Sequence, residues 1–112
     1  MKIKTSELTG AALDWAVARA DDVDYRVWKG MVVDECSNPL AYHDDWGLAG
    51  PIIERERLWV QPEIGKEGTA GAWYCVAIEP FDAYGTTPLI AAMRCYVASK
   101  LGDEVTIPEE LV

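Results

Sequence analysis

The segment 86–102 is a predicted helix whose two ends are both encoded in the sequence. Thr87 can cap the first free amides, and Pro88 fits the first helical position because the N–H that it lacks would be unpaired there. Gly102 can adopt the left-handed conformation that ends such a helix, and Lys100 lies in the last turn, near the negative end of the helix dipole. The sequence therefore predicts one long helix near the C-terminus.

This predicted helix has two different faces. At about 3.6 residues per turn, its bulky side chains share one broad face, formed by Leu89, Ile90, Met93, Tyr96, Val97 and Leu101. The other side carries small side chains, namely Ala91, Ala92, Cys95, Ala98 and Ser99. We expect the bulky face to pack on a core and the small face to allow another backbone to approach. Ala91 and Ala98 are therefore candidate contacts with a partner or with a second copy of the chain.

The composition predicts one folded domain. The chain has 112 residues, of which 50% are hydrophobic, and it includes five Trp and five Tyr. A chain of this length can bury roughly two-thirds of its unfolded surface without disulfides or a metal ion. We therefore expect a single domain over residues 1–112, in which residues 103–112 form an acidic tail that is either frayed or tucked along the surface.

The chain is strongly acidic. Its 19 Asp and Glu residues outnumber its 10 Lys and Arg residues, which gives a formal net charge of −9. This balance argues against direct nucleic-acid binding, which depends on Lys and Arg replacing counterions, and against adhesion to anionic membranes. The simpler interpretation is that the negative charge keeps a soluble protein from associating. The alternative is an acidic surface that imitates nucleic acid.

The first predicted helix starts at Thr9. Leu8 and Leu13 form a hydrophobic-staple pattern around this position, and the acidic run 21–24 ends the helix. Its buried face is expected to contain Leu13, Val17 and Ala20. Asp14 lies off this face, and Trp15 lies opposite it, so Trp15 is expected to be partly exposed or to meet a partner.

A second helix is predicted from Asp45, which can cap it, to about Arg57. Pro51 and two glycines within this segment disfavour a continuous helix, because proline interrupts the hydrogen bonds of a helix interior. Trp46 and Trp59 flank the segment, and we expect their side chains to pack together beneath it.

Three segments have the pattern of extended structure. Residues 25–35 and 58–61 are strand candidates, and residues 72–78 are apolar on both faces, which indicates a central strand. Residues 63–71 contain three glycines and are expected to form a loop, while residues 79–85 lead into the last helix. The order predicts an α+β fold with a small antiparallel sheet of about three strands. An N-terminal helix, a short middle helix and a long C-terminal helix are expected to pack on it.

No pattern in the chain indicates catalysis, a metal ion or a cofactor. Phosphate-binding, serine-hydrolase and zinc-protease motifs are absent, and Cys36, Cys75 and Cys95 lack the spacing of a zinc site or a disulfide framework. No signal peptide is evident, and no apolar run approaches the roughly 20 residues of a membrane span. We therefore expect a cytoplasmic protein with no cofactor.

The loop 42–46 concentrates the polar and aromatic residues that a small-ligand site would need. It contains Tyr42, His43 (the single histidine), two aspartates and Trp46. A pocket would require these side chains to converge, and nothing in the sequence supplies a nucleophile beside the histidine. We therefore expect His43 to be a surface loop residue and Asp45 to be a helix cap.

Three blocks of the sequence resemble one family of phage proteins. They are residues 6–18 (SELTGAALDWAVA), residues 45–55 with their DW and GPIIER segments, and residues 87–98 (TPLIAAMRCYVA). Together, and in this order, the blocks are similar to the phage NinX-like family of uncharacterised proteins. The resemblance implies a phage or prophage protein made in the bacterial cytoplasm. It implies no activity and no catalytic residue, because that family has no assigned biochemical function.

These observations favour an accessory protein that binds a host or phage protein, with or without self-association. The candidate interaction residues are Trp15, Tyr42, His43, Asp45, Trp46, Ala91 and Ala98. Two alternatives stay open. One is an acidic nucleic-acid mimic that inhibits a host DNA-binding protein, and the other is a small-ligand binder or an enzyme at the loop 42–46.

Overall fold

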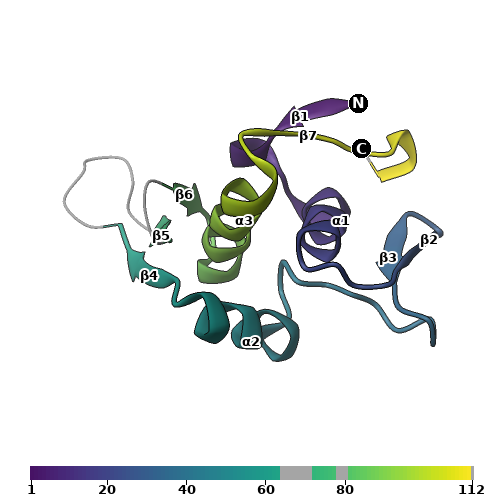
Figure 1. Ribbon diagram of the computed structural model, residues 1–112, viewed down its shortest axis with the longest axis horizontal. Helices are drawn as coiled ribbons and strands as arrows, with labels where there is room; N and C mark the ends of the chain where they lie inside the picture. The colour runs from purple at the N-terminus through teal and green to yellow at the C-terminus, as the bar shows by residue number, and fades with distance from the viewer. Residues whose placement is uncertain (64–71, 78–80, 112) are drawn as a thin grey trace.

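The computed structural model describes residues 1–63, 72–77 and 81–111, which form an α+β fold. The helices are η1 (Thr5–Glu7), α1 (Gly10–Ala20), α2 (Trp46–Glu56), α3 (Pro88–Leu101) and η2 (Glu109–Leu111). The strands are β1 (Lys2–Lys4), β2 (Arg26–Trp28), β3 (Met31–Val33), β4 (Trp59–Pro62), β5 (Trp73–Val76), β6 (Asp82–Gly85) and β7 (Glu104–Thr106). The predicted fold class and the three predicted helices are confirmed (Figure 1).

The main sheet has three antiparallel strands in the order β4-β5-β6. The prediction that the segment 72–78 forms the central strand is confirmed by β5. Strand β6 lies in the segment 79–85, which the sequence predicts only as a connection to the last helix. Most of the loop predicted at residues 63–71 lies outside the described residues.

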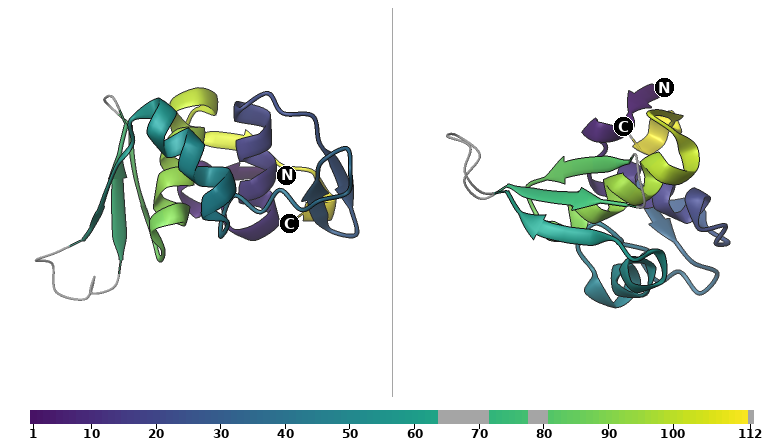
Figure 2. Two further views of the ribbon diagram at one scale, coloured as in Figure 1. Left: turned by 90° about the horizontal axis from the view of Figure 1, so that it is seen from below. Right: turned by 60° about the vertical axis from the view of Figure 1, so that its left-hand side comes forward.

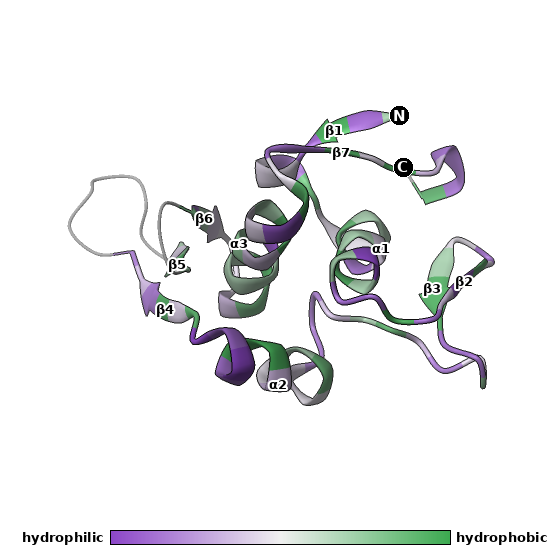
Figure 3. Ribbon diagram, in the orientation of Figure 1, coloured by the Kyte–Doolittle hydropathy of each residue, from purple (hydrophilic) through white to green (hydrophobic). Residues whose placement is uncertain are grey.

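Helix α3 is the centre of the fold; it begins as the sequence predicts and ends at the predicted Gly102, whose φ is positive but whose ψ of −168° differs from the left-handed helical conformation. The Thr87 hydroxyl accepts a hydrogen bond from the amide of Ile90 at 3.1 Å, Pro88 occupies the first turn, and Gly102 follows the helix with a φ of 90°. Helix α3 contacts all three strands of the main sheet on one side, and α1 and α2 on others (Figures 1 and 2). Colouring by hydropathy shows apolar segments of α1 and α3 in the middle of the molecule (Figure 3).

The small-residue face of α3 packs on the main sheet of the same chain. A Cβ atom placed on Gly85 of β6 would lie 2.6 Å from the backbone nitrogen of Ala91, and the Cys95 thiol donates to the carbonyl of Phe81 at 3.6 Å. Ala91 is fully buried and Ala98 nearly so. The expected close approach of another backbone is therefore made within the chain. Ala91 therefore cannot face a partner in this fold, because β6 covers it. Ala98 lines a cavity of about 450 Å³ with Asp82 and Ala83 of β6, and its contact with a partner stays a prediction.

Helix α2 also starts as predicted. The Asp45 carboxylate accepts a hydrogen bond from the amide of Gly47 at 2.8 Å, and Arg57 ends the helix in the left-handed conformation. Pro51 lies inside the helix without ending it. It removes the donor to the carbonyl of Gly47, and Gly47 is exposed, so water can satisfy that carbonyl instead.

The two ends of the chain pair with each other. Strand β7 is antiparallel to β1, with Ile3 opposite Val105, and the N-terminal ammonium donates to the carbonyl of Ile107 at 2.9 Å. The Thr5 hydroxyl donates to the carbonyl of Gly102 at 2.6 Å, which ties this pair to the end of α3. Of the two expectations for the tail, fraying is wrong: the tail is tucked along the molecule, where it supplies strand β7 and the buried Val105 and Ile107. No helix within the described residues is long and apolar enough to cross a membrane.

Candidate interaction surface

His43 holds a buried carboxylate rather than standing free in a surface loop. Its ring nitrogen Nδ1 lies 2.8 and 2.9 Å from the two carboxylate oxygens of Asp14, and its backbone amide donates to Asp14 Oδ1 at 2.9 Å. The other ring nitrogen lies 3.6 Å from the exposed carboxylate of Asp44. The pair joins α1 to the segment before α2, which the sequence separates by 29 residues. The Asp14–His43 pair therefore connects helix α1 to the segment before α2.

The prediction that Asp14 lies off the buried side of α1 is wrong, because only 5% of Asp14 is exposed. The segment around Val32, Ala41 and His43 covers this side of the helix and leaves a cavity of about 130 Å³ beside the carboxylate. Burial raises the pKa of Asp14, and the hydrogen bonds from His43 oppose this effect without cancelling it. Without a hydrogen-bond donor, a carboxylate buried to this degree would destabilise the fold, so Asp14 depends on His43.

The raised pKa of Asp14 predicts how this residue changes stability with pH. Because the folded chain holds the proton more tightly than the unfolded chain, Asp14 contributes most to stability below its ordinary pKa of 3.8. That contribution is lost as pH rises through the raised pKa. We therefore expect the free energy of unfolding of wild type minus that of Asp14→Asn to fall as pH rises from 3.8, as measured by urea denaturation. A difference that grows with pH would mean that His43 lowers the pKa instead.

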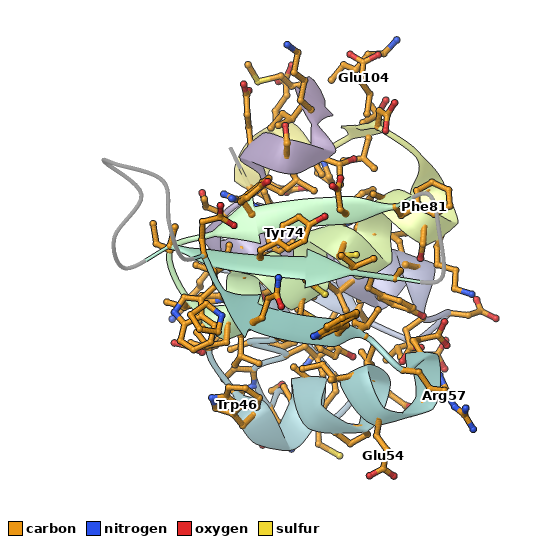
Figure 4. All side chains as sticks on the ribbon, turned by 90° about the vertical axis from the view of Figure 1, so that its left-hand side faces the viewer. Trp46, Glu54, Arg57, Tyr74, Phe81 and Glu104 are labelled. Atoms are coloured by element: carbon orange, nitrogen blue, oxygen red, sulfur yellow. The ribbon has the colours of Figure 1, made fainter. Side chains whose placement is uncertain are left out.

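The loop 42–46 does not converge on a ligand-sized pocket. Tyr42 is buried, and burial raises its pKa first, followed by the negative charges of Asp21 and Asp14. Trp46 is 57% exposed and points away from the body at the start of α2 (Figure 4). The cavity between His43, Trp46 and Pro88 has a volume of about 170 Å³. Ligand pockets usually have about 300–1,000 Å³, so this loop offers little room for a small molecule.

Trp15 is partly exposed, in agreement with its position opposite the predicted buried face. Its ring meets the edge of Tyr25 at a centroid distance of 6.3 Å, and the Arg19 guanidinium lies 5.4 Å from its centroid. These neighbours come from the same chain and cover much of the ring. Trp15 is therefore a side chain at the margin of the core.

The prediction that Trp46 and Trp59 pack together beneath α2 is wrong. Trp59 is 68% exposed on strand β4, and Trp46 lies at the opposite end of the helix. The reason is the alternation of strand β4: Val60 is paired with the buried Cys75 and points toward α3, so Trp59 must point to the other side of the sheet.

The side of the main sheet that faces away from α3 is the outer sheet face. Side chains in register on adjacent strands share a face, so this face carries Trp59, Gln61, Tyr74, Val76, Asp82 and Tyr84. No helix or strand of the described residues lies over it, as the view onto Tyr74 shows (Figures 2 and 4). The sheet is therefore backed by α3 on one side and is open on the other.

The outer sheet face has an ordered set of aromatic contacts. The rings of Tyr74 and Tyr84 are paired across β5 and β6 with centroids 4.8 Å apart, and the Tyr74 hydroxyl donates to Asp82 at 2.9 Å. That hydrogen bond raises the pKa of Tyr74 to about 12, so the hydroxyl stays protonated at neutral pH. Arg94 of α3 donates to the carbonyl of Tyr84 at 2.8 Å and so ties β6 to the helix behind it.

The outer sheet face could not be predicted from the sequence, because Trp59 was expected beneath α2 and no strand was expected at β6. The available signal was the apolar character of both faces of the segment 72–78, which indicated a strand in the middle of a sheet. It did not indicate that one of those faces is uncovered.

Within the described residues, no three His, Cys, Asp or Glu side chains are grouped as metal ligands would be. A comparison with curated proteins finds no match. A comparison with protein families finds that the family described as "Bacteriophage P22, NinX" matches residues 4–100. This match includes the three blocks that resemble NinX-like proteins, and it extends over α1, α2, the main sheet and all of α3 except Leu101. The chain therefore belongs to the phage P22 NinX family.

Proposed function

We propose that this phage protein is a non-enzymatic accessory protein that binds a protein of the host or the phage through the outer sheet face. The observation that supports the proposal is the uncovered aromatic set of Trp59, Tyr74 and Tyr84 on a sheet that α3 holds from behind. Trp and Tyr are enriched in protein interfaces, because they bury a large area and still offer a polar atom at the edge. A set placed on strands is also more rigid than one placed on loops.

The experiment that tests this proposal compares matched variants in affinity capture from a lysate of the bacterial host. Trp59→Ala removes the most exposed ring of the outer sheet face, while Trp28→Ala removes an exposed tryptophan, 46% accessible, from the β2-β3 hairpin. We expect Trp59→Ala to reduce capture of the wild-type partner at least about tenfold, as truncation of a central interface residue does. Trp28→Ala should leave capture unchanged.

Several outcomes of the capture experiment would overturn the proposal. Equal capture of the same partner by wild type and Trp59→Ala would place the interface elsewhere. A basic nucleic-acid-binding protein, retained equally by both variants at low salt and lost at high salt, would favour the nucleic-acid mimic instead. If light scattering shows a dimer that Trp59→Ala dissociates, a second copy occupies this face and the proposed partner is wrong.

A further inference from the structure

The charge of the outer sheet face indicates which kind of partner side chain it can hold. Strands β4, β5 and β6 contain no Lys or Arg, and the face carries one carboxylate, Asp82, together with three aromatic rings. The whole chain has a formal net charge of −9. A cation is therefore favoured here both by the local carboxylate and by the field of the protein.

The register places an aromatic ring and a carboxylate on either side of one apolar residue. Trp59, Val76 and Asp82 form a single row across β4, β5 and β6. Because neighbouring strands lie about 4.8 Å apart, the two ends of this row are separated by about 10 Å, with Val76 as the floor between them. The Tyr74 hydroxyl, which donates to Asp82 Oδ2, orients the carboxylate over the sheet.

We propose that the outer sheet face binds an arginine side chain of a basic segment in its protein partner; this inference rests on the proposed function. The guanidinium stacks on Trp59 above Val76 and donates to Asp82. Arginine fits such a row better than lysine, since its planar group stacks on an aromatic ring and donates to a carboxylate in one plane. Lysine offers a compact, strongly hydrated charge that cannot do both.

Other occupants of this face are opposed by its charge. A second copy of the chain brings another net charge of −9 and a second Asp82 carboxylate to the same interface. Nucleic acid brings phosphates toward Asp82 and toward the negative field of the whole chain. A basic protein segment meets neither repulsion, because its positive charge is attracted by Asp82 and by the net negative charge of the chain.

The test is an NMR titration of the isotope-labelled full chain with two capped peptides of equal charge, tetra-arginine and tetra-lysine, in about 0.15 M salt. We expect the arginine peptide to shift the indole N–H signal of Trp59 and the amides of Tyr74 and Val76. Its affinity should exceed that of the lysine peptide about fivefold. The Trp59 signal is assigned from its loss in Trp59→Leu.

Three variants make the outcome specific to the outer sheet face. Trp59→Leu and Asp82→Asn should each weaken the arginine peptide about threefold to fivefold, and Trp28→Ala should leave its affinity unchanged. Equal affinity for both peptides, or equal affinity for wild type and both face variants, would overturn the inference. If Trp59→Ala abolishes capture of a partner while the peptides do not differ, the proposed function stands and only the arginine assignment fails.

Discussion

Replacing Gly85 with alanine is expected to destabilise the fold by about 3 kcal/mol, because the added methyl group has no room. Its Cβ atom would lie 2.6 Å from the backbone nitrogen of Ala91 and 2.8 Å from Cγ2 of Ile90. The Ala91 nitrogen cannot move away without the rest of the helix, because its N–H donates to the carbonyl of Thr87 at 3.1 Å in the first turn of α3. The methyl group must therefore push α3 away from the sheet. Urea denaturation measures the effect.

Gly50 provides a matched control for this substitution. It lies inside α2, and a Cβ atom placed on it would meet nothing within 4 Å. Alanine gains roughly 0.5–1 kcal/mol of helix propensity here, but its Cβ crowds the ring of the following Pro51, so Gly50→Ala should change the free energy of unfolding by less than about 1 kcal/mol. If Gly85→Ala is as stable as wild type, the close contact between β6 and α3 is not present in solution.

Replacing His43 with alanine is expected to destabilise the fold by about 2 kcal/mol at neutral pH, as loss of a hydrogen bond to a buried charged group does. The substitution leaves the carboxylate of Asp14, which is 5% exposed, with the backbone amide of residue 43 as its remaining partner from this loop. The cost should shrink in acid, because a protonated Asp14 no longer carries a buried charge. Thermal or urea unfolding at two pH values measures both effects.

The neighbouring carboxylate supplies the control for His43→Ala. Asp44 lies 3.6 Å from the other ring nitrogen, and its side chain is 69% exposed. Asp44→Ala should therefore change stability by less than about 0.5 kcal/mol. An equally small effect of His43→Ala would contradict the assignment of His43 as the partner of a buried charge.

Local signals were sufficient to predict the helices. The caps at Thr87 and Asp45, the proline at position 88 and the glycine at position 102 act within one turn of the chain, and all of them are found where the sequence predicts them. The central strand β5 was predicted for a similar reason, since its apolar pattern is continuous.

Contacts between distant segments could not be predicted from such signals. The β1-β7 pair joins the two ends of the chain, and the bond between Asp14 and His43 spans 29 residues. The exposure of Trp59 depends on which neighbour covers each side of β4, and no periodicity within a strand of four residues decides that. Ala91 illustrates the same point: the sequence indicated a close contact but not that the chain's own sheet makes it.

Whether the outer sheet face is the binding surface is tested most directly by hydroxyl-radical footprinting of the chain, alone and bound to the partner that affinity capture retains. All four probes are exposed in the free chain: Trp59 and Tyr84 on the outer sheet face, and Trp28 and Trp46 elsewhere. We expect the partner to protect Trp59 and Tyr84 from oxidation and to leave Trp28 and Trp46 as reactive as before. Protection of Trp28 or Trp46, with Trp59 and Tyr84 unchanged, would contradict the assignment of the outer sheet face as the binding surface.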